Sequence, residues 1–172
     1  MNNPDADLCG ELEWIGAPEA RPPGLDRVYP RYVDLVGRLL EEAAQLGVRL
    51  MLENGRATRA NARLLDKLLA AFPTLSLHLD VGHTNLGERN QTASLLRKHG
   101  RRVIHLHFSD NRGEHDDHRH LGWGNVDWPA MVRLLKRQGY DGTVTLEVFA
   151  SGRRGVLLSR RRLLEWWTSS AT

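Results

Sequence analysis

The segment Val103-Ile104-His105-Leu106-His107 decides the fold, because it is an apolar stretch that ends in a side chain able to bind a metal. Three other apolar stretches have the same form, and they end at Glu53, Asp80 and Glu147. The terminal residues are spaced by 27 positions (53 to 80), 27 positions (80 to 107) and 40 positions (107 to 147). A strand, a helix and two short loops take about thirty residues. The spacing therefore predicts a repeat of βα units with parallel strands.

Helical patterns fill the intervals between these strands. Apolar residues recur at helical spacing over 32–46, and Gly47 follows as the expected stop. Further helices are predicted over 59–71, 91–99, 128–138 and 156–167, with Asp127 as the N-cap of the helix over 128–138. We expect a loop after the strand that ends at Asp80, the longest loop over 109–126, and irregular structure over 1–27. The pattern predicts an α/β fold in one domain over 1–172, with βα units over 28–167.

Side-chain alternation separates two faces in each predicted strand. One face is apolar, with residues such as Leu77, Leu106 and Leu146, and should pack on helices. The other face is mostly polar and carries the coordinating residue at the carboxyl end of the strand. In a βα barrel this polar face looks into the barrel, and the active site lies at the carboxyl rim.

Length and composition limit the class of protein. The 172 residues are few for a complete eight-stranded βα barrel, which needs about 250. The length therefore accommodates only part of such a barrel. Cys9 is the single cysteine, which excludes an intrachain disulfide. No signal peptide and no apolar run of about 18 residues is evident, so the expected location is cytoplasmic and without a membrane partner.

The net charge of +3 comes largely from arginines near the C-terminus, a pattern more typical of a solvated helix face than of a phosphate-binding surface.

The four strand-end residues form a candidate metal site. Glu53, Asp80, His107 and Glu147 together offer three carboxylates and one imidazole, a mixture that suits Mn, Mg, Co or Zn as a divalent ion. Taken singly, each is as readily a capping or salt-bridging residue. Four at matched positions on one rim favour a metal site.

Three further residues could extend that site. His83 follows Asp80 by three positions, and either reaches the metal or a substrate oxygen or fixes its loop by hydrogen bonding. Asp116 and His118 lie in the long loop, where they could reach a second metal or a substrate phosphate. His78 and His105 lie deeper on the polar face, and we expect them to be interior or supporting residues rather than ligands.

The chain resembles the xylose-isomerase-like barrel superfamily over about residues 30–165. The resemblance implies the C-terminal portion of a (β/α)8 TIM barrel, with the N-terminal strands missing. That superfamily holds sugar and sugar-phosphate isomerases and epimerases and the apurinic endonucleases. The matching motifs agree in order and spacing: Leu-Glu-Asn (52–54), Asp-Val-Gly-His (80–83), His-Leu-His-Phe-Ser-Asp-Asn (105–111), Asp-Asp-His…Gly-Trp-Gly…Asp-Trp (116–128) and Thr-Leu-Glu (145–147).

The resemblance assigns roles to the candidate residues. It implies that the shared metal ligands are Glu53, Asp80, His107 and Glu147, with Glu53 and Glu147 also moving a proton in catalysis. His83 then corresponds to the adjacent metal- or substrate-binding histidine. Asp116 and His118 correspond to an extra pair that the endonucleases use for further metal binding and that many epimerase-like members also carry.

Three functions follow as hypotheses. The first is a metal-dependent isomerase or epimerase of a small-molecule sugar or sugar phosphate, acting by proton transfer alpha to a metal-bound carbonyl. The second is an apurinic-endonuclease-like phosphodiesterase acting on DNA. The resemblance implies that such endonucleases take two further metal-binding histidines from the earlier strands of the barrel, and this sequence lacks them, so no nucleic-acid partner is expected. The third is a truncated fragment that is inactive alone. An open half-sheet leaves an unpaired edge, which also makes a homodimer an expected state.

Overall fold

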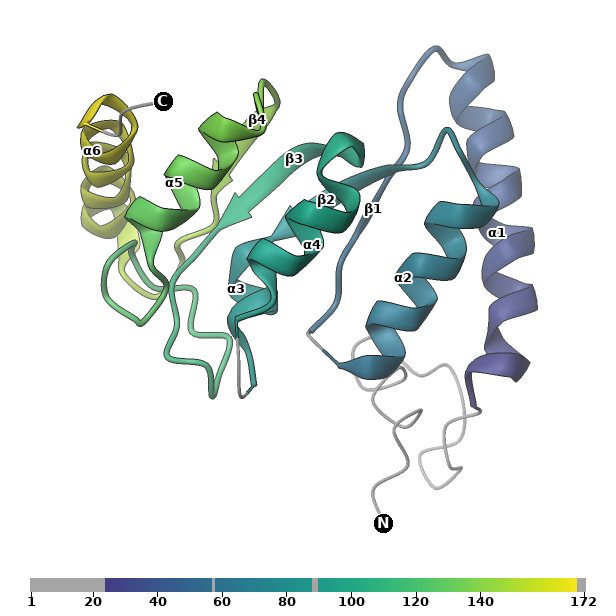
Figure 1. Ribbon diagram of the computed structural model, residues 1–172, viewed down its shortest axis with the longest axis horizontal. Coiled ribbons are helices and arrows are strands. Elements are labelled where there is room, and N and C mark those ends of the chain that lie inside the picture. The colour runs from purple at the N-terminus through teal and green to yellow at the C-terminus, as the bar shows by residue number, and fades with distance from the viewer. Residues whose placement is uncertain (1–23, 57, 88–89, 170–172) are drawn as a thin grey trace. The chain divides into compact units, whose positions relative to one another are not determined.

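The structure is a computed structural model that describes residues 24–56, 58–87 and 90–169. Four parallel strands alternate with helices, which confirms the predicted α/β fold (Figure 1). The chain divides into two compact parts, which we call the N-terminal unit (Met1–Ser76) and the C-terminal unit (Leu77–Thr172). Among the described residues, no helix is long and apolar enough to cross a membrane.

The N-terminal unit contains α1 (Leu25–Gln45), β1 (Met51–Glu53) and α2 (Arg59–Ala71). The prediction of a helix over 32–46 was correct in kind but began too late, because α1 already starts at Leu25 and contains Pro30. Pro30 lies in the second turn of α1, where its missing N–H removes one intrahelical hydrogen bond. The predicted irregular segment therefore does not extend to residue 27, and residues 1–23 lie outside the described ranges.

The two helices of the N-terminal unit form its core. The Thr58 side chain accepts a hydrogen bond from the Asn61 N–H at 3.1 Å and so begins α2 at the predicted residue. Leu68 is fully buried, and the Phe72 ring lies within van der Waals reach of Gly37 in α1. The Ser76 N–H donates to the Leu50 carbonyl at 3.0 Å, which ties the start of β2 to the segment before β1.

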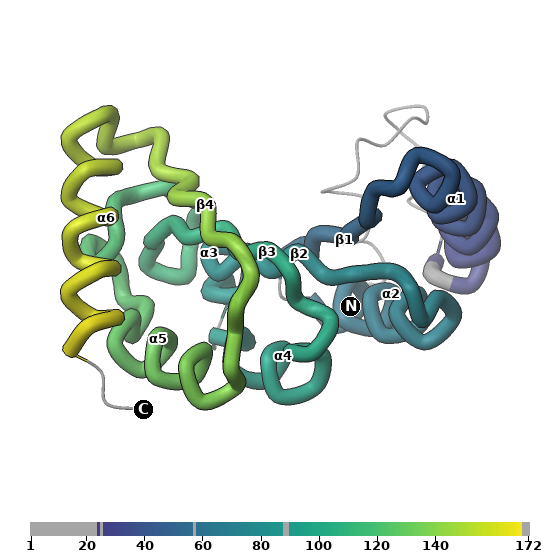
Figure 2. The backbone as a smooth tube through the Cα atoms, turned by 90° about the horizontal axis from the view of Figure 1, so that it is seen from above, coloured from purple at the N-terminus to yellow at the C-terminus, as the bar shows by residue number. Residues whose placement is uncertain are grey.

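The C-terminal unit carries the other strands and most of the helices (Figures 1 and 2). Its elements, with β2 beginning at Ser76, are β2 (Ser76–Asp80), α3 (Val81–Asn85), α4 (Thr92–His99), the 3-10 turn Gly100–Arg102, β3 (Val103–Phe108), α5 (Trp128–Arg137), β4 (Thr143–Leu146) and α6 (Gly152–Ser169). The short helix α3 stands where we expected a loop, and α6 begins four residues before the predicted start at 156. Asp127 caps α5 as predicted, because its side chain accepts from the Ala130 N–H at 2.9 Å.

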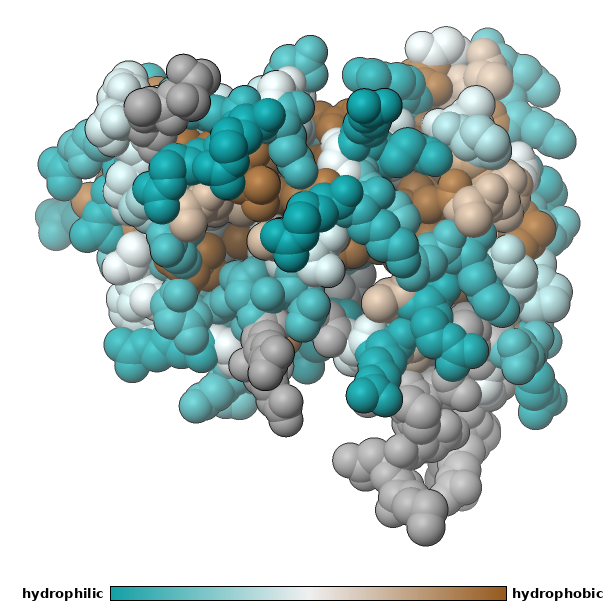
Figure 3. Space-filling model, viewed as in Figure 1, coloured by the Kyte–Doolittle hydropathy of each residue, from teal (hydrophilic) through white to brown (hydrophobic). Residues whose placement is uncertain are grey.

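The helices of this unit bury the apolar face of its strands. Leu79, Leu106 and Phe108 are each fully buried, as the alternation predicted. α5 and α6 lie side by side, with the Trp128 and Trp166 rings stacked at 6.4 Å between centroids (Figure 2). In Figure 3, hydrophilic side chains cover much of the face over α4 and α5, and hydrophobic ones show between them.

Strand register brings the polar residues into rows. β2, β3 and β4 are parallel neighbours, and Asp80, His107 and Thr145 are aligned across them. The register between β2 and β3 shifts at one point, since Leu77 is paired with Val103 but His78 is paired with His105. Ile104 is thus the extra residue of a bulge. Without this bulge Asp80 would be paired with Leu106, and the polar faces of β2 and β3 would not coincide.

Candidate metal centre

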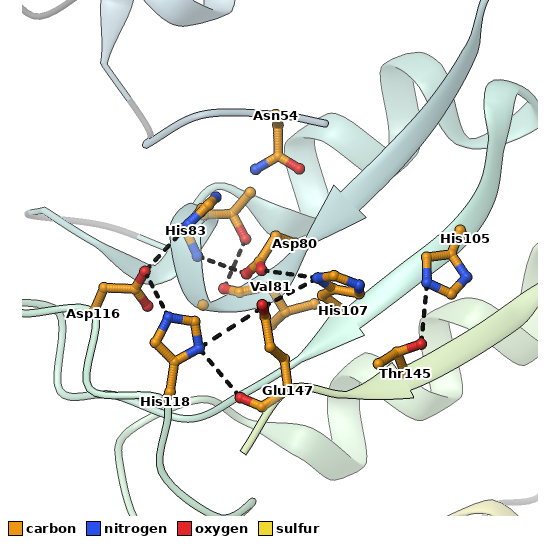
Figure 4. Close-up of polar contacts among 12 residues, drawn as sticks. Asn54, Asp80, Val81, His83, His105, His107, Asp116, His118, Thr145 and Glu147 are labelled. Atoms are coloured by element: carbon orange, nitrogen blue, oxygen red, sulfur yellow. Dashed lines mark hydrogen bonds and ion pairs between the residues drawn. The ribbon is translucent and has the colours of Figure 1, made fainter. Parts of the chain in front are cut away.

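Asp80, His107 and Glu147 converge at the carboxyl ends of their strands (Figure 4). His107 Nδ1 lies 3.0 Å from Glu147 Oε2 and 3.7 Å from Asp80 Oδ2. One ligand atom from each of the three residues lies within 4.8 Å of the others, a separation compatible with binding one ion. The C-terminal unit therefore brings together three of the four ligands predicted from the sequence.

The two oxygens of the Asp80 carboxylate have different contacts. Its Oδ1 accepts a hydrogen bond from the His83 N–H at 2.9 Å, which caps α3. Its Oδ2 faces His107, and the side chain is 0% exposed, compared with 23% for Glu147. A carboxylate this deeply buried needs a compensating positive charge, which a cation or a protonated imidazole supplies.

A second group of residues lies beside the first. Asp116 Oδ2 is 3.2 Å from His83 Nε2 and also 3.2 Å from His118 Nε2. His118 Nδ1 is 3.2 Å from the carbonyl oxygen and 3.8 Å from Oε2 of Glu147, so this histidine connects the two groups. His118 adopts φ 44°, a left-handed conformation that is uncommon for a residue other than glycine. The structure thus brings His83, Asp116 and His118 together, and their roles toward a second metal or a substrate stay predictions from the sequence.

The long loop is anchored by Asp110 and Asn111, which belong to the matching motif over 105–111 but for which the sequence predicted no role. Asp110 is fully buried, and its Oδ2 accepts hydrogen bonds from the Gly122 N–H at 2.7 Å and from Trp128 Nε1 at 2.8 Å. Asn111 donates from Nδ2 to the Gly82 carbonyl at 2.9 Å, and its Oδ1 accepts from Asn85 Nδ2 at 2.9 Å. These contacts hold the segment with Asp116 and His118 against α3. Their partners are distant in the sequence, so hydrophobic periodicity gives no signal for them.

Two histidines lie below the ligands on the same face. His78 is 6% exposed, and burial, followed by the nearby His107, His105 and His83, lowers its pKa to about 4. His105 Nδ1 is 2.6 Å from Thr143 Oγ1, and its Nε2 is 3.2 Å from Thr145 Oγ1. Burial and then His107 also lower the pKa of His105. The lowered pKa favours the neutral form of both rings.

Glu53 is the last residue of β1 in the N-terminal unit, and it is exposed. Its role as a fourth ligand stays a prediction from the sequence.

The donors of the C-terminal unit fit a divalent cation. Two carboxylates that face the same imidazole repel each other in the absence of a positive charge. One nitrogen and two carboxylate oxygens form a ligand set used for manganese, zinc and cobalt, and for magnesium when water supplies further oxygens. Asp80, His107 and Glu147 are the residues that could hold such an ion.

Comparisons with known proteins identify relatives. A family model described as "Xylose isomerase-like TIM barrel" matches residues 7–169. A ketose 3-epimerase from Arthrobacter globiformis is 32% identical over 123 residues, which cover 67% of this chain and 40% of that protein. An uncharacterised protein from Methanocaldococcus jannaschii is 29% identical over 119 residues, which cover 65% of this chain and 41% of that protein. The chain thus spans about two fifths of the length of these curated relatives.

Solved structures share the fold. The crystal structure of a D-tagatose 3-epimerase-like protein matches with a TM-score of 0.71 and 24% identity, over 82% of this chain and 55% of that one. A protein from Thermus thermophilus, soaked with ZnCl2, matches with a TM-score of 0.67 and 26% identity, over 91% of this chain and 60% of that one.

Proposed function

The chain belongs to the xylose isomerase-like TIM barrel family, and from this premise we propose that it acts in the metal-dependent isomerisation or epimerisation of a small sugar or sugar phosphate. The observation that supports the proposal most directly is the convergence of Asp80, His107 and Glu147 within 4.8 Å. The ketose 3-epimerase relative agrees with a ketose as the substrate class. Of the candidate ions, Mn, Co and Zn fit the nitrogen donor best, and Mg fits least well.

Each residue would have a distinct part in the reaction. A bound divalent ion supplies Lewis-acid polarisation of the substrate carbonyl and its neighbouring hydroxyl. Asp80, His107 and Glu147 would hold the ion. Glu147 is the accessible carboxylate of the group, so we assign to it the removal of the proton from the carbon alpha to the carbonyl, in which the C–H bond breaks and the proton passes to a Glu147 oxygen. Glu53 is proposed as the carboxylate that delivers a proton, and His83 as the residue that orients a substrate oxygen.

The metal assignment is tested by Mn2+ titration of the purified chain, followed by electron paramagnetic resonance. Glu147→Gln should weaken Mn2+ binding at least tenfold, because it removes a charged oxygen ligand. Glu165→Gln is the matched control, since Glu165 is exposed on α6 and the charge change is the same. Equal Mn2+ affinity in the two variants would show that Glu147 is not a ligand.

The reaction is tested by deuterium incorporation from D2O into ketopentoses, ketohexoses and their phosphates, measured by mass spectrometry. We expect exchange at the carbon next to the carbonyl with Mn2+ or Co2+ present, and its loss in Glu147→Gln and Glu53→Gln. Mn2+ binding without any exchange would favour a chain that needs further polypeptide for turnover, and native mass spectrometry would show whether a homodimer forms.

A second candidate function is phosphodiester cleavage of abasic DNA. The observation that favours it is the position of Asp116, which lies 3.2 Å from both His83 and His118 and could bind a further zinc ion with them. DNA affinity that falls steeply between 50 and 200 mM salt would support this function, because a protein with about six to ten phosphate contacts loses affinity in this way. Indifference to DNA would leave the sugar reaction as the remaining proposal.

A further inference from the structure

Three histidines form a compact cluster on the polar face of the C-terminal unit. Ring centroids are 3.9 Å apart for His78 and His107, 4.8 Å for His78 and His105, and 5.2 Å for His105 and His107. One ring nitrogen from each lies within 4.8 Å of the others. We propose that these residues form a second cation site, composed of nitrogen donors, that takes a divalent ion such as Cu2+, Ni2+ or Zn2+.

The bulge at Ile104 creates this cluster. It sets His78 of β2 directly beside His105 of β3, and the regular register beyond it places His107 beside Asp80. Bulges of this kind re-aim side chains and are frequent next to functional sites. All three histidines stand on strands of a parallel sheet, so their backbone positions are fixed before any ion binds.

The His105 ring is already oriented by two threonines of β4. Thr143 Oγ1 and Thr145 Oγ1 each lie within hydrogen-bond distance of one of its nitrogens. An ion would replace one of these contacts and leave the other to fix the ring and its tautomer. Histidine ligands of metal sites commonly have this arrangement, in which one nitrogen binds the metal and the other is hydrogen-bonded.

His107 would be shared between the two sites. Its Nδ1 faces Glu147 and Asp80, so the carboxylate site uses that nitrogen. The proposal assigns Nε2, on the opposite edge of the ring, to the histidine site. The two sites then differ in preference: the oxygen-rich site suits Mn2+, whereas three imidazoles favour ions late in the first transition series.

Cu2+ binding to the metal-free chain tests the proposal, with bound Cu2+ counted by native mass spectrometry. The wild-type chain should bind one more Cu2+ than His105→Gln or His78→Gln does. His115→Gln is the matched control, because His115 is exposed in the long loop. His105→Gln is the main variant, since His105 is less buried than His78 and glutamine can still hydrogen-bond to a threonine. Circular dichroism should show both variants folded.

The outcomes separate this site from the carboxylate site. We expect His105→Gln to keep wild-type Mn2+ affinity. We expect Glu147→Gln to keep the Cu2+ ion that His105→Gln loses, and the paramagnetic resonance spectrum of that Cu2+ ion should show nitrogen couplings. Equal Cu2+ counts in the wild type, His105→Gln and His115→Gln would overturn the proposal. Loss of both Cu2+ and Mn2+ in a folded His105→Gln chain would also overturn it, because His105 would then act only by positioning His107. If the wild type fails to bind Mn2+ but the Cu2+ results are as expected, this would count against the proposed function and not against the histidine site.

Discussion

Replacement of Asp110 should destabilise the long loop, and alanine should do so more than asparagine. The carboxylate accepts hydrogen bonds from the Gly122 N–H and from Trp128 Nε1, at 2.7 and 2.8 Å, and Trp128 is 1% exposed. A hydrogen bond to a charged group contributes about 1.5–3 kcal/mol, and a buried donor without a partner costs a similar amount. Asp110→Ala should therefore lower the free energy of unfolding by about 3–6 kcal/mol.

Asp110→Asn is the intermediate step, because both short hydrogen bonds go to Oδ2 and one amide oxygen at that position keeps both. Neutral hydrogen bonds are about half as strong as charge-assisted ones, so the expected cost is about 2 kcal/mol. Urea unfolding, followed by tryptophan fluorescence and circular dichroism, measures both costs.

Glu114→Gln is the control for the Asp110 series, since Glu114 is exposed in the same loop and the charge change matches that of Asp110→Asn. It should change the free energy of unfolding by less than about 0.5 kcal/mol. If Asp110→Ala costs no more than about 1 kcal/mol, or no more than Asp110→Asn, then Asp110 does not anchor the loop as described.

Three other predictions concern the metal centre and the end of β4. Asp80→Asn should lower Mn2+ affinity at least tenfold while leaving the fold intact, because asparagine still caps α3; a destabilised chain in thermal unfolding would contradict this. Gly82→Ala should also weaken Mn2+ binding, since its Cβ would clash with Ser109 Oγ and lie 3.1 Å from Asp80 Oδ1. Gly37→Ala, with a Cβ 3.7 Å from the nearest side chain, should not weaken it. Burial and then Asp141 raise the pKa of Tyr140 to about 12 from 10.0. The unfolded chain therefore binds fewer protons than the native chain between pH 10 and 12, so stability should fall over that range, and Tyr140→Phe should reduce the fall in urea titrations.

The fold could be predicted from local signals where those signals were strong. α2 matches its predicted bounds because Thr58 supplies a cap and apolar residues recur at helical spacing. Asp127 was identified as the N-cap of α5 because aspartate is favoured at that position. α3 was missed because Val81-Gly82-His83-Thr84-Asn85 has low helix propensity. Its one turn is stabilised by the Asp80 side chain and by the Asn111 amide, which lies 29 residues beyond its partner Gly82.

The candidate site could be predicted only in part. Asp80, His107 and Glu147 were found because each ends an apolar stretch, and strand ends of a parallel sheet meet at one edge. Asp110 lies in a motif that the sequence did show, but its role was not predicted because that role depends on two donors 12 and 18 residues further along the chain. A short-range pattern does not record such contacts. The left-handed backbone of His118 has no sequence signal either, since residues with a Cβ rarely adopt it.

The bulge at Ile104 connects the fold to both proposed ion sites. From the pairing of Leu77 with Val103, a regular ladder would place Asp80 beside Leu106, and neighbouring residues of parallel strands share a face. Asp80 would then point to the face that Leu106 buries against helices, away from His107. One extra residue in β3 reverses this and aligns Asp80 with His107 and His78 with His105. Alternation within each strand predicts which residues share a face, but only the register between strands decides which of them meet. Here a single residue fixes that register for the carboxylate site and the histidine cluster together.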